Sequence, residues 1–178
     1  MGHSTHPIDE FIQILNAHCI RQLVDVRTIP RSRHNPQFNR ESLSGSLYAE
    51  GIVYRHMPGL GGLRKPSRDS INIGWRNASF RGYADYMQTP EFHENLEKLI
   101  GLATEAPTAI MCAEAVPWRC HRSLIADALV AHGIAVQEIM SASKAQSHAL
   151  TAFAKVEGTE VAYPGGGESS LKLEFDGP

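Results

Sequence analysis

The chain has 178 residues, of which 42% are apolar and 20% charged, and its formal net charge at pH 7 is −2. These values are typical of one globular domain with a single core, and no apolar run approaches the roughly 18 to 20 residues that span a bilayer. Met1 is not followed by a secretory leader, and the three cysteines have no disulfide-framework spacing. We therefore expect a cytoplasmic protein with reduced thiols and no membrane partner.

Positive charge is concentrated between Arg21 and Arg81, where ten arginines and one lysine stand against four acidic residues. Arginine binds carboxylate, sulfate or phosphate through paired hydrogen bonds, although any single arginine is as often a solvated surface residue. The sequence pI of about 6.5 disfavours broad, nonspecific DNA binding. The cluster therefore predicts a local anion site.

The first half of the chain predicts two helices and two strands. One helical face near the start carries four apolar residues: Ile8, Phe11, Ile12 and Leu15. Residues 22–27 predict a buried strand, and a turn-rich loop follows it with four arginines: Arg27, Arg31, Arg33 and Arg40. A helix over 40–50 and a strand over 52–54 are predicted next.

Three features follow the second strand. Gly61 and Gly62 lack the Lys-Ser/Thr ending of a phosphate loop, so they predict a tight turn with backbone close to another group. Residues 64–77 predict an irregular segment that could act as a lid. Tyr83 and Tyr86 share a helical face, which suits either core packing or stacking on a base.

The second half predicts a helix from Thr89, a strand over 109–112, a helix ending at Gly133, and a fourth strand over 134–140. Residues 147–155 predict a further helix and 161–163 an extended piece. The alternating residues 171–175 are compatible with an edge strand.

Together these elements predict a single α/β domain with a mostly parallel sheet of four to five strands and helices on both faces. The domain covers residues 1–163, and residues 164–178 form a Gly/Ser linker and tail. The carboxyl ends of parallel strands lie at one sheet edge. We therefore expect Arg27, residues 57–62 and Cys112 to share a cleft.

The stretch from Thr108 to Gly133 predicts strand, loop and helix, with Cys112 at the end of the strand and Cys120-His121-Arg122 at the start of the helix. A helix amino end and cationic neighbours lower a thiol pKa. The favoured hypothesis is a thiol enzyme, a transferase or hydrolase, for a small anionic substrate containing phosphate or sulfur. One cysteine attacks while the other resolves or accepts sulfur.

The remaining roles in this hypothesis go to neighbouring side chains. Glu114 or His121 moves the proton, and the substrate is held by Arg27, Arg31 and Arg122. Other roles are equally compatible with these residues, because Glu114 could orient the arginines, and the cysteines could be inert core groups.

Two alternatives stay open. The first is a module that binds a nucleotide or nucleic acid without covalent chemistry, using the arginine loop and a tyrosine. The second is a metal site of Cys112, Cys120 and His121, whose spacing matches no common zinc pattern. We expect no metal and no cofactor, and the sequence leaves the oligomeric state open.

Several strings resemble the bacterial domain-of-unknown-function family 488 over residues 2–163: GHST, LVDVRTIPRSR, NPQFN, GIVYRHMPGLGG, RGYADYM, TPEF and MCAEAVPWRCHRSLIADAL. The resemblance implies an α/β fold and an intracellular bacterial protein, without a settled reaction. Its motifs map onto twelve positions: His3, Ser4, Arg27, Arg31, Arg33, Gly61, Gly62, Cys112, Glu114, Cys120, His121 and Arg122.

A fainter likeness is to rhodanese-type sulfurtransferases, which also have a buried strand ending in Asp-Val-Arg and a later strand ending in cysteine. Here the loop from Cys112 to Arg122 is longer, and neither Cys112 nor Cys120 has an arginine five residues on.

Overall fold

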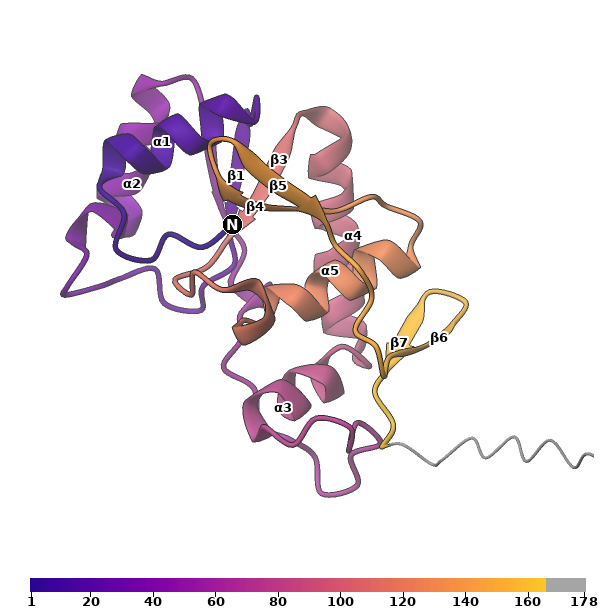
Figure 1. Cartoon of the computed structure of the whole chain (residues 1–178). Helices are drawn as coiled ribbons and strands as arrows, with labels where there is room; N and C mark the ends of the chain where they lie inside the picture. Colours follow the sequence, from indigo (N-terminus) through magenta and orange to yellow (C-terminus); the bar gives the residue numbers. More distant parts are fainter. Residues whose placement is uncertain (166–178) are drawn as a thin grey trace, which may run out of the picture.

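A parallel sheet of three strands, in the order β2-β1-β3, lies at the centre of the computed structural model, which describes residues 1–165 (Figure 1). The strands are β1 (Gln22–Asp25), β2 (Val53–His56) and β3 (Thr108–Met111). β1 pairs with a neighbour on each side, so that Val24 lies opposite both Arg55 and Ile110. All four residues of β1 are buried: Leu23 and Val24 pack into the apolar core, and the polar Gln22 and Asp25 are hydrogen-bonded to Thr108 and Tyr54.

Five α-helices surround this sheet in the described residues: α1 (Ile8–Ala17), α2 (Arg40–Ala49), α3 (Ala78–Tyr86), α4 (Pro90–Glu105) and α5 (Arg122–Ala131). Short 3-10 turns follow β1, β2 and β3: η1 (Pro36–Phe38), η2 (Pro58–Leu60) and η3 (Pro117–Arg119). Thr89 caps α4 by accepting a hydrogen bond from the Phe92 N–H. Gly51 and Gly133 end α2 and α5 at φ of 69° and 75°, where a side chain would be strained.

The helices cover both faces of the sheet, as predicted. Side chains alternate along β1, so Leu23 packs with Phe11 of α1 and Leu43 of α2. Val24 points the other way and packs with residues of α4 and α5. Figure 1 shows the same arrangement, with α1 and α2 on one side of the sheet and α4 and α5 on the other.

The prediction of four to five sheet strands was wrong. Residues 134–140 do not join the main sheet, because β4 (Gln137–Ser141) pairs with β5 (Lys144–Ser147) in a separate antiparallel hairpin. The outer edge of β3 is instead contacted by the start of the chain. The Met1 amino group donates to the Ile110 carbonyl at 2.8 Å, and Gly2 forms a parallel bridge with Cys112.

The predicted helix over 147–155 was also wrong. Ser147 ends β5, and Lys155 begins a second hairpin of β6 (Lys155–Glu157) and β7 (Glu160–Ala162). The intervening chain is held by Asp127 of α5, which accepts hydrogen bonds from the backbone and hydroxyl of Thr151. The irregular segment predicted over 64–77 is confirmed, since it contains no helix or strand. The possible edge strand over 171–175 lies outside the described residues.

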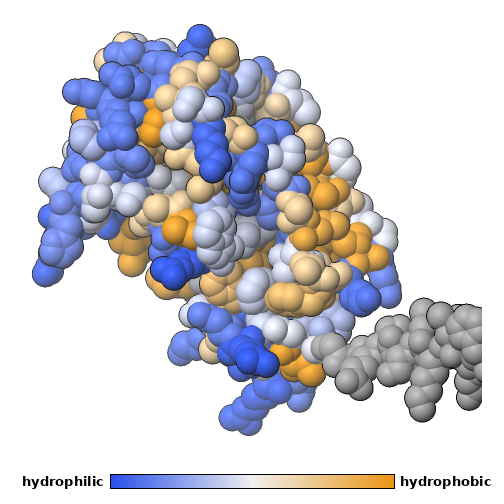
Figure 2. Space-filling model, in the orientation of Figure 1, coloured by the Kyte–Doolittle hydropathy of each residue, from blue (hydrophilic) through white to orange (hydrophobic). Residues whose placement is uncertain are grey.

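The surface differs between parts of the molecule. Figure 2 shows mainly hydrophilic side chains over α1 and α2, and apolar side chains gathered around α5. Among residues 1–165, no helix combines the length and apolar character that crossing a membrane requires.

Candidate functional site

An open cleft of about 670 Å³ lies where the three parallel strands end. Its walls come from the loops after all three strands and from the first residues of the chain. Arg31 follows β1, Gly62 follows β2, and Cys112 follows β3, while His3 belongs to the initial segment. Parallel strands end at one sheet edge, so these distant residues meet, as the sequence predicted.

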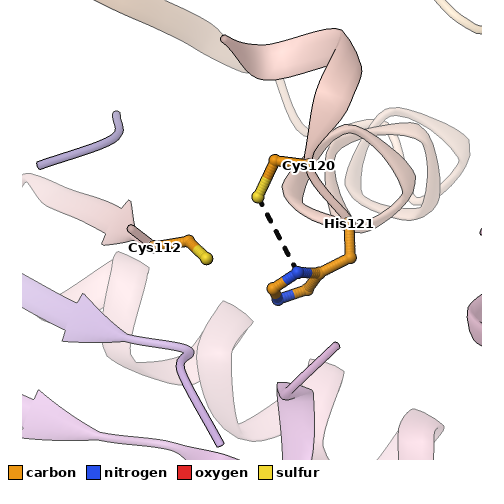
Figure 3. Close-up of side chains that lie close together, drawn as sticks. All are labelled: Cys112, Cys120 and His121. Carbon is orange, nitrogen blue, oxygen red and sulfur yellow. Dashed lines mark hydrogen bonds between the residues drawn. The ribbon is translucent and has the colours of Figure 1, made fainter. Parts of the chain in front are cut away.

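Three reactive side chains meet at this cleft: Cys112, Cys120 and His121 (Figure 3). Their sulfur and ring nitrogen atoms all lie within 4.8 Å of one another. Cys112 and His121 line the cleft, whereas Cys120 lies behind them and is only 3% exposed. The cluster therefore has an accessible thiol and a buried one.

The two adjacent residues Cys120 and His121 point to the same place because the backbone turns between them. Cys120 is extended, with φ −128° and ψ 143°, and His121 is helical, with φ −56° and ψ −14°. Their Sγ and Nδ1 atoms come within 3.7 Å. A side chain at Gly62 would place its Cβ 2.5 Å from the His121 Nδ1, so glycine is required there.

Arg122 connects the segments that carry the two cysteines. Its side chain is buried, its Nε donates to the Cys120 sulfur at 3.3 Å, and its Nη2 donates to the carbonyl of Glu114. The guanidinium therefore provides a positive charge for a thiolate and fixes the loop after Cys112.

Each thiol affects the pKa of the other. The neighbouring Cys112 thiol lowers the pKa of Cys120, and His121 and Arg122 lower it further, although burial opposes them. The neighbouring Cys120 sulfur, together with burial, raises the pKa of Cys112. The pair thus loses one proton easily and holds the second tightly, with Cys120 as the more acidic thiol.

Arg27, predicted to bind an anion, is largely occupied by the protein itself. It is 6% exposed and binds the carboxylate of Asp25 through Nε at 2.9 Å and Nη2 at 2.6 Å. Burial opposes its charge, but the bonds to Asp25 outweigh burial and raise the pKa of Arg27. Asp25 also accepts from the Tyr54 hydroxyl at 2.8 Å, so this ion pair builds the cleft wall.

His3 and Ser4 form the part of the wall nearest the start of the chain. His3 is buried, stacks on Phe38 and faces the Nη1 of Arg27 at 3.2 Å. Because a guanidinium only donates, His3 accepts at Nε2 and donates from Nδ1 to the Ser4 carbonyl. Burial lowers the pKa of His3 to about 4, which agrees with this neutral tautomer. Ser4 adopts φ of 47° and binds the Ala113 carbonyl.

The other predicted positions differ in their access to the cleft. Arg31 is exposed on its wall, whereas Arg33 is exposed outside it. Gly61 is buried against Thr28, where a Cβ would lie 2.3 Å from the hydroxyl oxygen. Glu114 lines the cleft, but its carboxylate accepts from the Val116 N–H at 3.2 Å within its own loop.

Sequence reasoning missed several cleft residues. Hydroxyl and amide groups come from Thr5, Thr28, Ser32 and Asn35. Two large apolar side chains, Ile29 and Leu63, are 65% and 77% exposed and line the same cleft. Their positions in the loops that follow β1 and β2 were the available signal, but an exposed apolar residue is common on any surface.

The predicted tyrosine pair belongs to the core. Tyr83 is fully buried and donates to the Leu60 carbonyl at 2.9 Å. Tyr86 is covered by the Arg64 guanidinium, which lies 3.5 Å above its ring. Neither ring is therefore presented for stacking on a base.

Cys112, Cys120 and His121 could supply three ligands to a metal ion, since their ligand atoms lie close together. However, Arg122 donates to one of the two sulfurs and places a positive charge beside any bound cation. This electrostatic environment favours thiolate or another anion over a metal.

No curated protein and no solved structure matches the chain, so the likeness to rhodanese-type sulfurtransferases is not shown. A family model does match it, over residues 7–129, which is more than half of the chain. The protein therefore belongs to the family described as domain of unknown function DUF488.

Proposed function

We propose that the protein is a thiol-dependent enzyme, a transferase or hydrolase, acting on a small anionic substrate that contains phosphate or sulfur. One observation carries the proposal: the cleft-lining Cys112 has a second thiol, Cys120, and the imidazole of His121 within 4.8 Å. Arg122 donates a hydrogen bond to the Cys120 sulfur, and its positive charge stabilises the thiolate. A cysteine that only fills space in the core does not require such a neighbour.

Cys112 is the nucleophile in this proposal, because its sulfur is the one that faces the cleft. The thiolate is the reactive form of cysteine. When Cys112 attacks, its proton passes to Cys120 or to His121, whose ligand atoms lie within 4.8 Å of the Cys112 sulfur. The base is therefore within reach before any substrate binds.

Arg31 is the side chain best placed to hold the anionic group. It is exposed on the cleft wall and makes no salt bridge to any described residue. Arg27, in contrast, is neutralised by Asp25. An unpaired guanidinium can bind phosphate or sulfate with two hydrogen bonds.

Alkylation of Cys112 tests the proposal. The background is Cys19→Asn, because Cys19 is exposed and has φ of 55°, which asparagine tolerates. Iodoacetamide modification of Cys112, followed by peptide mass spectrometry, is expected to slow several-fold when sulfate or phosphate occupies the cleft. Arg31→Gln is expected to raise the anion concentration that gives half of this protection about 10-fold, as for a lost charged hydrogen bond, whereas Arg33→Gln leaves it unchanged.

Two results would contradict the proposed enzymatic function. Cys112 could react only at the rate of the unfolded chain and ignore both anions, which would remove the nucleophile. Alternatively, a nucleotide could bind with steep salt dependence and equal affinity before and after alkylation, which would favour binding without covalent chemistry.

A further inference from the structure

Cys120 is shielded from the cleft, although its surroundings stabilise a negative charge on its sulfur. The Cys120 side chain is buried and does not contribute to the cleft surface. A molecule in the cleft therefore meets the sulfur of Cys112 but not that of Cys120. Yet Cys120 carries the strongest stabilisation for a negative charge, from the Nε of Arg122 at 3.3 Å and the ring of His121 at 3.7 Å.

A buried thiolate can react only with a group that is brought to it. The atom of the site that Cys120 can reach is the Cys112 sulfur, at 4.8 Å or less. A sulfur that has become part of a disulfide is an electrophile for thiolates. Cys120 would therefore act after Cys112 has taken a sulfur group from the substrate.

Resting on the proposed role of Cys112 as nucleophile, we propose that Cys120 is the resolving thiol of a two-cysteine site and that the substrate is an anionic disulfide. This assignment selects sulfur over phosphorus. A phosphoryl group on Cys112 would place its negative charges beside the Cys120 thiolate, and like charges at this distance repel.

The reaction has two displacement steps. The Cys112 thiolate attacks one sulfur of R–S–S–R′, forming Cys112–S–S–R and releasing R′S⁻ with the electron pair of the broken bond. The Cys120 thiolate then attacks the Cys112 sulfur and releases RS⁻. Two electrons pass from the cysteines to the substrate. The proton of Cys112, taken up by Cys120 or His121 in the first step, passes on to the released R′S⁻, so that Cys120 is again a thiolate when it attacks. The protein retains a Cys112–Cys120 disulfide. A low-molecular-weight dithiol would reduce that disulfide and become oxidised itself.

In the second step the two sulfurs close from a separation of no more than 4.8 Å to bonding distance, about 2.05 Å. Cys112 lies at the end of β3, where a loop without regular structure begins, and Cys120 is in an extended conformation before α5. Arg122 binds both the Cys120 sulfur and the carbonyl of Glu114, two residues after Cys112. The same side chain therefore keeps the two segments together while the sulfurs react.

The cleft also fits an organic substituent next to the disulfide. Ile29 and Leu63 are exposed on its walls, and Arg31 lies on the same surface. Ile29 and Leu63 can contact an apolar ring or chain, and Arg31 can pair with a carboxylate. The cleft therefore suits a disulfide whose substituent is apolar and carries a carboxylate. The aromatic dicarboxylate 5,5′-dithiobis(2-nitrobenzoate) has these features and releases a coloured thiolate, so it is a suitable probe.

The test uses reduced Cys19→Asn protein and an excess of this probe, with released thiolate followed by absorbance and the protein by intact mass. The expected result is two released thiolates per chain and a protein lighter by about 2 Da, without an adduct, because both cysteines end in one disulfide. In Cys120→Ser, release is expected to stop at one thiolate, with the adduct retained on Cys112. Dithiothreitol is expected to restore both free thiols.

The outcomes separate this inference from the function on which it rests. A stable adduct on Cys112 with Cys120 still free, in the Cys19→Asn protein, would overturn the resolving role and leave the nucleophile intact. Reaction of Cys112 no faster than in urea-unfolded protein would remove the nucleophile itself. Both readings come from the protein with an unaltered site, so they hold even if Cys120→Ser fails to fold.

Discussion

Arg122 is the residue on which the proposed chemistry of the cleft most directly depends. It is 5% exposed, donates to the Cys120 sulfur and holds the loop carbonyl of Glu114. Sequence reasoning placed this arginine on the substrate, because a guanidinium next to Cys-His indicates an anion site. The structure instead shows its hydrogen bonds directed to the protein's own thiol and backbone.

Replacing Arg122 by glutamine is expected to raise the pKa of Cys120, since the nearest positive charge and one hydrogen bond are lost. Alkylation of Cys112 at pH 6 should then slow about 10-fold, and the free energy of unfolding should fall by about 1 to 3 kcal/mol. Arg119→Gln removes the same charge from an exposed position one turn earlier. Equal behaviour of the two variants, in alkylation rate and urea denaturation, would show that Arg122 has no special role.

Arg27 illustrates what residue identity alone cannot reveal. The sequence Asp25-Val26-Arg27 predicted a buried strand followed by a cationic loop, and the strand is present. The guanidinium, however, is folded back onto Asp25 two residues earlier. Whether an arginine faces a ligand or a neighbouring carboxylate depends on backbone direction after the strand, and composition does not encode that direction.

For single helices and strands, the sequence predicted correctly the features that depend on residues close together in the chain. Thr89-Pro90 starts α4, glycines end α2 and α5, and Leu23 and Val24 of β1 are buried on opposite faces. These features depend on capping, φ and periodicity, which the sequence contains directly.

Local signals failed where the partner lies far away in the chain. Residues 147–155 were predicted to form a helix, and the structure has none there. Phe153 instead packs on the rings of Trp75 and Tyr163. The error over 134–140 was the opposite: the expected partner was a distant strand of the main sheet, whereas the observed partner is β5, the next strand along the chain.

The connection between α5 and the two hairpins predicts a pH-dependent stability. His148 lies between Asp127 and Glu138, with ring nitrogen to carboxylate distances of 2.8 Å on both sides. The hydrogen bond to Asp127 and then that to Glu138 raise the pKa of His148, although burial opposes them. Asp127 also accepts hydrogen bonds from Thr151 and Tyr163.

A raised folded-state pKa means that this stabilisation is fully present below the unfolded value of about 6.5 and is lost as pH rises through the folded value. His148→Gln should therefore lower the free energy of unfolding by about 1 to 3 kcal/mol near pH 6. The difference from the unmodified chain should shrink at higher pH. Urea denaturation across this range measures it, with exposed His34→Gln as the control. A difference that stays constant with pH would contradict the ionic role.

For the whole molecule, the cleft is a consequence of topology. Three parallel strands end at one edge, so loops that are far apart in sequence bring Arg31, Gly62 and Cys112 onto a common surface. This arrangement was predictable from the alternation of strands and helices. The sequence could not predict that Cys112 lines the cleft while Cys120 is buried. Both cysteines lie at the ends of elements and differ only in their tertiary surroundings.

In the proposed mechanism, Cys112 and Cys120 act as one unit with a single easily lost proton. The most direct test is the pH profile of Cys112 alkylation, measured in Cys19→Asn protein with and without the further change Cys120→Ser. With both thiols present, we predict an inflection well below the value of about 8.5 for a free thiol; with Cys120→Ser, that inflection should vanish and reactivity should begin only near or above 8.5. Identical profiles with a single inflection near 8.5 would contradict the account.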